Sequence, residues 1–164
     1  MSLNGSKIFA SLVTVALLAT APAALADDPI KDIVDREVPA LKNGSRIPMP
    51  DIENAILAAC ARRNFKATIS EPGIITARWQ RRGHWFDVTI PYTNTAYSIR
   101  YKDSERFDYN PTRQRIDDAY NEYVKGLADH IEADFDEALD RMKELQKRVK
   151  KDKKVARINP RYAA

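Results

Sequence analysis

The chain has 164 residues, 30% of them charged, and a formal net charge of +4. This mild balance argues against a nucleic-acid-binding protein, because such proteins carry strongly basic patches. The single cysteine, Cys60, excludes an internal disulfide, and five glycines provide no Gly-rich phosphate-binding loop.

Residues 1–26 have the pattern of a cleavable secretory signal peptide. Lys7 supplies the basic start, an apolar run covers residues 8–18, and Ala24-Leu25-Ala26 matches the A-x-A cleavage motif. The apolar run is short for a transmembrane helix. We therefore expect cleavage after Ala26 and a periplasmic mature chain; the alternative is an uncleaved anchor.

Residues 27–48 are expected to form a linker with a short helix. Ile30, Val34 and Val38 recur every four residues, which favours a helix over residues 29–37 before Pro39 breaks it. We interpret this segment as a linker or a loosely docked arm.

The first strong helical pattern covers residues 51–63. Asp51 is the expected N-cap, and Asn64 is the expected left-handed stop. Cys60 lies on this helix among alanines and is interpreted as a small buried residue, with a reactive thiol as the alternative. The apolar face has spacing i, i+3, i+4 and i+7 and consists of Ile52, Ala55, Ile56 and Ala59.

Residues 74–102 predict a three-stranded antiparallel meander. A two-residue turn at Arg82-Gly83 pairs residues whose numbers add to 165, so Trp79 faces Phe86. A second turn at residues 93–94 pairs residues whose numbers add to 187, so Phe86 faces Tyr101. This register places the large apolar side chains, apart from Trp85, on one face of the sheet.

A fourth strand is expected over residues 65–70, before the Pro72-Gly73 turn. A two-residue turn would pair Ile69 with Thr76, on the polar face. Burial of this strand's apolar residues therefore requires a bulge or an unusual loop.

The polar face of the meander contains a candidate ligand-binding site. The same register places Asp87 between Arg78 on one neighbouring strand and Arg100 on the other, with Trp85 beside them. Two guanidinium groups that share one carboxylate can bind a small anion. The alternative is a solvated cross-strand ion pair, worth roughly 0.2–1 kcal/mol.

The last helix is expected to begin at Asn110, as N-cap, and Pro111. Nine acids and one base lie between Asp117 and Asp140, whereas nine bases and two acids lie between Arg141 and Arg157. The second half is too long for a four-stranded sheet to cover, so we expect self-association, an unknown envelope protein or an anionic membrane surface as its partner. The buried stripe runs through Ile116, Tyr120, Tyr123, Val124, Leu127, Ile131, Phe135, Leu139, Met142, Leu145 and Val149.

The sequence carries no strong motif for catalysis or metal binding. The two histidines, His84 and His130, show no metal-ligand spacing, and there is no G-x-S-x-G element. Only His84 with Asp103-Ser104 would suggest a hydrolase. We therefore expect no cofactor, no metal and no enzymatic activity.

A series of short motifs runs through the central region and consists of Pro72, Gly73, Ile74, Ala77, Arg81, His84, Val88, Ile90, Tyr92, Tyr97, Ser98, Ile99, Tyr101, Asp103, Ser104, Tyr109, Ile116, Tyr120, Asn121, Tyr123, Val124 and Leu127. In the order of these motifs the region resembles an uncharacterised family of small proteobacterial periplasmic proteins and lipoproteins. This resemblance covers roughly residues 51–131 and implies no assigned activity, so no functional residue follows from it. The chain differs from the lipoproteins because its leader lacks a lipobox cysteine.

The sequence predicts an α+β fold in which a helix precedes a four-stranded antiparallel sheet and a long C-terminal helix. Both helices should cover the apolar face of the sheet. The expected organisation is a signal peptide at 1–26, a linker or short helix at 27–48, the α-β-β-β-β-α domain at 49–135 and a charged helical extension at 136–164. The expected function is that of a non-enzymatic envelope-associated interaction module; the alternatives are a small-anion-binding protein and a hydrolase.

Overall fold

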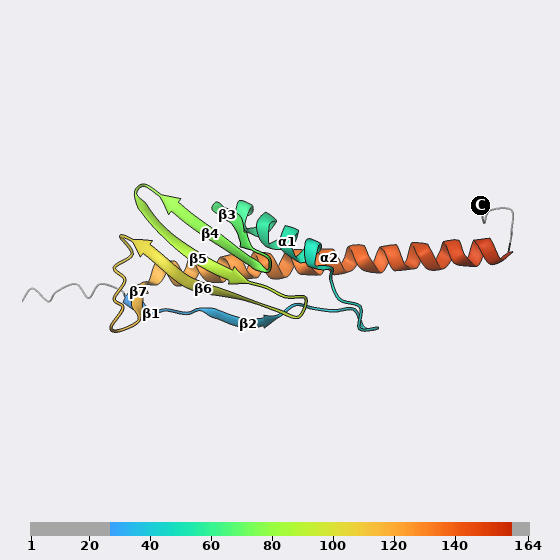
Figure 1. Cartoon of the computed structure of the whole chain (residues 1–164), viewed down its shortest axis with the longest axis horizontal. Helices are drawn as coiled ribbons and strands as arrows, with labels where there is room; N and C mark the ends of the chain where they lie inside the picture. The colour runs from blue at the N-terminus through green and yellow to red at the C-terminus, as the bar shows by residue number, and fades with distance from the viewer. Residues whose placement is uncertain (1–26, 159–164) are drawn as a thin grey trace, which may run out of the picture.

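The computed structural model describes residues 27–158, so the expected signal peptide and its cleavage site lie outside the described residues. An antiparallel sheet carries both helices on one face, and the long C-terminal helix extends well beyond it (Figure 1). The elements are β1 (Asp27–Pro29), β2 (Ile33–Glu37), α1 (Met49–Arg62), β3 (Phe65–Glu71), β4 (Ile74–Arg81), β5 (His84–Pro91), β6 (Ala96–Glu105), β7 (Arg115–Asp117) and α2 (Asp118–Ile158).

The α+β class and the antiparallel sheet are confirmed, but the main sheet has five strands rather than four. Its order is β2-β6-β5-β4-β3, and β1 pairs separately with β7. The expected helix over residues 29–37 is wrong, because β2 from this segment pairs with β6. This pairing satisfies backbone groups that an edge strand would leave open. Val38, Leu41 and Ile47 are buried, so the segment is part of the domain rather than a loose arm.

The β4–β5 hairpin has the predicted register, and Trp79 faces Phe86. Arg82 and Gly83 both have positive φ, of 49° and 81°, as a type I′ turn requires. The predicted strand β3 and its irregular turn are confirmed, since a register shift after Ile69 lets Ile69 pair with Ile75. The expected burial holds for Phe65 but not for Ile69, which is 49% exposed.

The β5–β6 register differs from the prediction by two residues between Val88 and Tyr92, and by three between Trp85 and Asp87. The predicted pairing of Phe86 with Tyr101 is wrong, because Phe86 pairs with Ser104. Thr93 and Asn94 do not adopt the positive φ of a two-residue turn; instead the Thr93 Oγ1 atom accepts hydrogen bonds from the backbone N–H groups of Thr95 and Ala96. The longer loop pairs Tyr92 with Tyr97 and Val88 with Tyr101. Because side chains alternate with a period of two, the two-residue difference between Val88 and Tyr92 keeps the apolar residues there on the same face.

Both helices begin at different residues from those predicted. Helix α1 starts at Met49, two residues before Asp51, with Pro50 in its first turn. Asn110 does not begin α2; its side chain instead accepts a hydrogen bond from the Arg113 N–H group. The Asp117 carboxylate caps α2 through the Ala119 N–H group.

Helix α2 covers the apolar face of the sheet only along its first half. Its 41 residues extend about 60 Å at 1.5 Å per residue. Phe135 and Leu139 are buried, whereas Leu145 and Val149 are 60% and 51% exposed. Within residues 27–158 no helix has both the length and the hydropathy needed to cross a membrane.

Candidate functional site

The predicted polar-face site is only partly assembled. Arg78 donates two hydrogen bonds of 2.7 Å to Asp87, and its guanidinium carbon lies 4.1 Å from the centroid of the Trp85 ring. The Trp85 indole N–H donates to Glu105. The hydrogen bonds to Asp87 are the main reason that the pKa of Arg78 is raised. Two of the Arg78 donors are thus already occupied.

Arg100 does not complete the expected Arg–Asp–Arg row. A bulge in β6 pairs Asp87 with Asp103, while Arg100 faces Thr89. The geometric expectation for Arg100 is therefore wrong. Two carboxylates and one arginine now occupy the row, which makes this part of the face less favourable to an anion.

His84 and Ser104, the residues considered for a hydrolase, do not contact each other as a catalytic pair would. The His84 ring packs edge-on against Phe107, with 6.2 Å between centroids. The Ser104 hydroxyl instead hydrogen-bonds to the Tyr101 hydroxyl. Among residues 27–158 no group of three or more His, Cys, Asp and Glu side chains is arranged to hold a metal ion.

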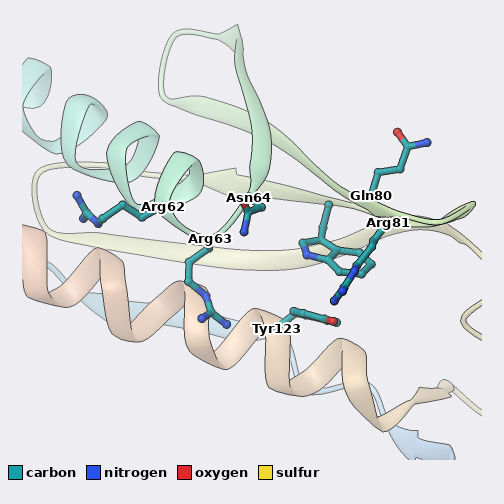
Figure 2. A pocket seen from close by; sticks show the side chains of 7 residues that line it. Arg62, Arg63, Asn64, Gln80, Arg81 and Tyr123 are labelled. Atoms are coloured by element: carbon teal, nitrogen blue, oxygen red, sulfur yellow. The ribbon is translucent and has the colours of Figure 1, made fainter.

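A cleft that the sequence did not reveal lies between the end of α1, the end of β4 and α2. Figure 2 shows Arg63 and Arg81 reaching toward α2, from which Tyr123 projects, while Gln80 points away. The cleft has a volume of about 410 Å³. We call it the arginine cleft; its lining residues are Arg62, Arg63, Asn64, Trp79, Gln80, Arg81 and Tyr123.

The three arginines of the cleft differ in their partners. Arg62 forms an ion pair with Asp134 of α2. Within the described part of the chain neither Arg63 nor Arg81 forms an ion pair, and the Arg63 Nε atom is buried without a hydrogen-bond partner. The cleft therefore carries two uncompensated positive charges.

Gly126 of α2 provides the space that Arg63 occupies. A Cβ atom at this position would lie 2.5 Å from Arg63 Nη2 and 3.0 Å from its Cζ. Glycine inside a helix costs about 1 kcal/mol relative to alanine. Here it allows the guanidinium to lie against the helix backbone. The sequence signal was a lone glycine within a helical pattern, and only the fold shows which side chain it admits.

The segment of α2 beyond residue 140 is the second candidate surface. Ion pairs between neighbouring turns join Arg141 to Glu137, Lys143 to Asp140 and Lys147 to Glu144. From residue 148 to residue 157 there are six bases and one acid, and these side chains are exposed. No ion pair involves the described side chains of this last part. We call residues 148–157 the basic end.

These features define an α+β protein with a projecting charged helix and an arginine-lined cleft. The chain matches no family model, no curated protein and no solved structure.

Proposed function

We propose that this protein is a non-enzymatic, envelope-associated binding protein whose basic end contacts an anionic phospholipid surface. Its periplasmic location is supported by the signal-peptide pattern of residues 1–26. In this proposal the α+β domain is the folded body, and the projecting part of α2 is the contact element.

The charge distribution of α2 is the observation that carries the proposal. Acids accompany the bases up to Lys147, whereas residues 148–157 contain a single acid, Asp152. A Lys or Arg near an anionic membrane surface contributes about 1 kcal/mol. The six bases of the basic end can therefore hold the protein reversibly at such a surface.

A second copy of the chain is a less favourable partner. Two basic ends placed side by side would repel each other. The apolar stripe through Leu145 and Val149 continues at Asp152, so a coiled-coil seam would be interrupted after two turns. The repulsion opposes a parallel pair of chains, and the interrupted stripe opposes a coiled coil of either direction, so the two observations together favour a negatively charged surface.

The test is co-sedimentation with vesicles of phosphatidylglycerol and phosphatidylcholine at low salt. A variant with four bases of the basic end changed to glutamine should bind about a thousandfold more weakly, since four charges contribute about 4 kcal/mol. Wild-type binding should also fall at high salt. The changes are Lys150→Gln, Lys151→Gln, Lys153→Gln and Lys154→Gln.

The matched control removes four exposed charges from the domain and should bind nearly as the wild type does. Equal losses in the two variants would show that only net charge matters and would contradict a specific role for α2. Concentration-dependent dimers without vesicle binding would favour a second copy instead. The control changes are Lys42→Gln, Lys66→Gln, Lys102→Gln and Arg113→Gln.

A further inference from the structure

We propose that the arginine cleft binds the phosphate group of a phosphate monoester. The cleft is lined by residues of α1, β4 and α2 and by Arg63 and Asn64 in the turn after α1 (Figure 2). None of its lining residues belongs to the basic end. This site does not depend on the proposed function, which concerns residues 148–157.

Charge matching identifies the ligand class. Arg63 and Arg81 bring two positive charges into the cleft, and none of its seven lining residues is acidic. A phosphate monoester carries about −1.5 to −2 charges at pH 7, which matches two guanidiniums. A carboxylate carries one charge and matches one arginine, as Asp134 does with Arg62.

The position of Arg63 is set before any ligand binds. Its guanidinium lies against α2 at Gly126, and its Nε atom is buried without an acceptor. A charge that is partly removed from water interacts more strongly with a counter-ion than a fully solvated charge does. Preorganisation also reduces the entropy lost on binding.

The end of α1 opposes anion binding, but more weakly than the arginines favour it. A helix C-terminus carries roughly half a negative charge, whereas Arg63 and Arg81 carry two full positive charges. Trp79 and Tyr123, whose rings lie 4.3 Å apart, supply an aromatic wall for the organic part of an ester.

The Gly126→Ala variant tests the phosphate site without weakening the fold. The new Cβ atom would displace the Arg63 guanidinium, while alanine favours the helix more than glycine does. We expect titration calorimetry to show phenyl phosphate binding to the wild type and at least tenfold weaker binding to this variant. Arg63→Gln and Arg81→Gln should weaken binding similarly. Arg113→Gln, which removes an exposed charge outside the cleft, should leave the affinity within twofold of wild type.

Three further ligands and one variant complete the test. Benzoate should bind at least tenfold more weakly than phenyl phosphate. Dihexanoyl phosphatidic acid, a soluble lipid, distinguishes the possible sources of the phosphate. If this lipid binds more tightly, the natural ligand is a lipid headgroup; if phenyl phosphate or inorganic phosphate binds more tightly, the ligand is a small solute. The proposal is overturned if no phosphate compound binds at millimolar concentration, if benzoate binds equally well, or if Gly126→Ala binds as the wild type does.

The quadruple lysine variant of the basic end should keep the wild-type affinity for phenyl phosphate. Failure of the phosphate-site proposal is therefore distinguishable from failure of the membrane-binding proposal.

Discussion

Trp79 is the residue at which the aromatic core meets the arginine cleft. Its ring lies 5.7 Å from Phe86, 6.0 Å from Phe107 and 4.3 Å from Tyr123, measured between ring centroids. It is 8% exposed. Its contacts therefore join β4 to β5, to the loop after β6 and to α2.

Trp79→Ala should lower the free energy of unfolding by about 3–5 kcal/mol, because the cavity left by a large buried aromatic is not refilled. Urea denaturation measures this loss. Trp85→Ala is the matched control on the polar face, where the cation–π contact with Arg78 contributes about 0.5–1 kcal/mol. A loss below about 1 kcal/mol for Trp79→Ala would contradict its place in the core.

Cys60 should be unreactive in the folded protein. Burial raises the pKa of its thiol to about 12, so the nucleophilic thiolate is scarce at neutral pH. A thiol-specific reagent should modify Cys60 only as fast as the protein opens, and urea should accelerate the reaction. Rapid modification of the native protein would instead support the reactive-thiol interpretation.

At the scale of elements, α2 has two parts with different environments. Up to Leu139 the side chains of its apolar stripe are buried or partly buried against the sheet and α1. Beyond this point the contacts with the domain are few: Met142 packs partly against the core, and Gln146 hydrogen-bonds to Asn43 and Ser45 at 3.4 and 3.5 Å. The first part stabilises the fold, and the second contributes little.

Deletion of residues 141–164 should therefore leave the melting temperature almost unchanged while it abolishes binding to anionic vesicles. Helices gain most of their stability from packing, and the exposed part of α2 has little packing to lose. Thermal unfolding followed by circular dichroism tests this. A truncated domain that unfolds would show that the tail stabilises the fold and would contradict the prediction.

At the scale of the whole molecule, several buried acidic groups share one pH response. Burial raises the pKa of Cys60 to about 12 from 9.0, and that of Tyr92, which also hydrogen-bonds to Glu53, to about 12 from 10.0. Burial likewise raises the pKa values of Tyr97 and Tyr120. Each group is held in its protonated form by the fold, so its contribution to stability is complete below the unfolded pKa and is lost as pH rises toward the folded pKa.

We expect the contribution of these groups to the free energy of unfolding to stay nearly constant between pH 7 and 9 and to fall between pH 9 and 12. The Cys60 difference alone corresponds to about 4 kcal/mol. Urea midpoints measured across this range test the expectation, and Cys60→Ala should make the early part of the decline shallower. A midpoint that stays constant to pH 12 would contradict it.

Features that depend on residues close together in the chain followed from the amino-acid sequence alone. Arg82-Gly83 selects a two-residue turn, and this turn places Arg78 opposite Asp87 without help from the rest of the chain. The alternation of apolar residues in β4 and β5 determined which face is buried, because side chains in a strand alternate with a period of two.

Features that join residues far apart in the chain became visible only in the folded domain. The pairing of β2 with β6 and the β6 bulge, which places Asp103 rather than Arg100 opposite Asp87, depend on backbone pairing that no local pattern encodes. The arginine cleft arises because α1 and α2 pack together and bring Arg63 against Gly126, 63 positions later. Contacts of this kind depend on the packing of the whole domain, so local sequence patterns do not predict them.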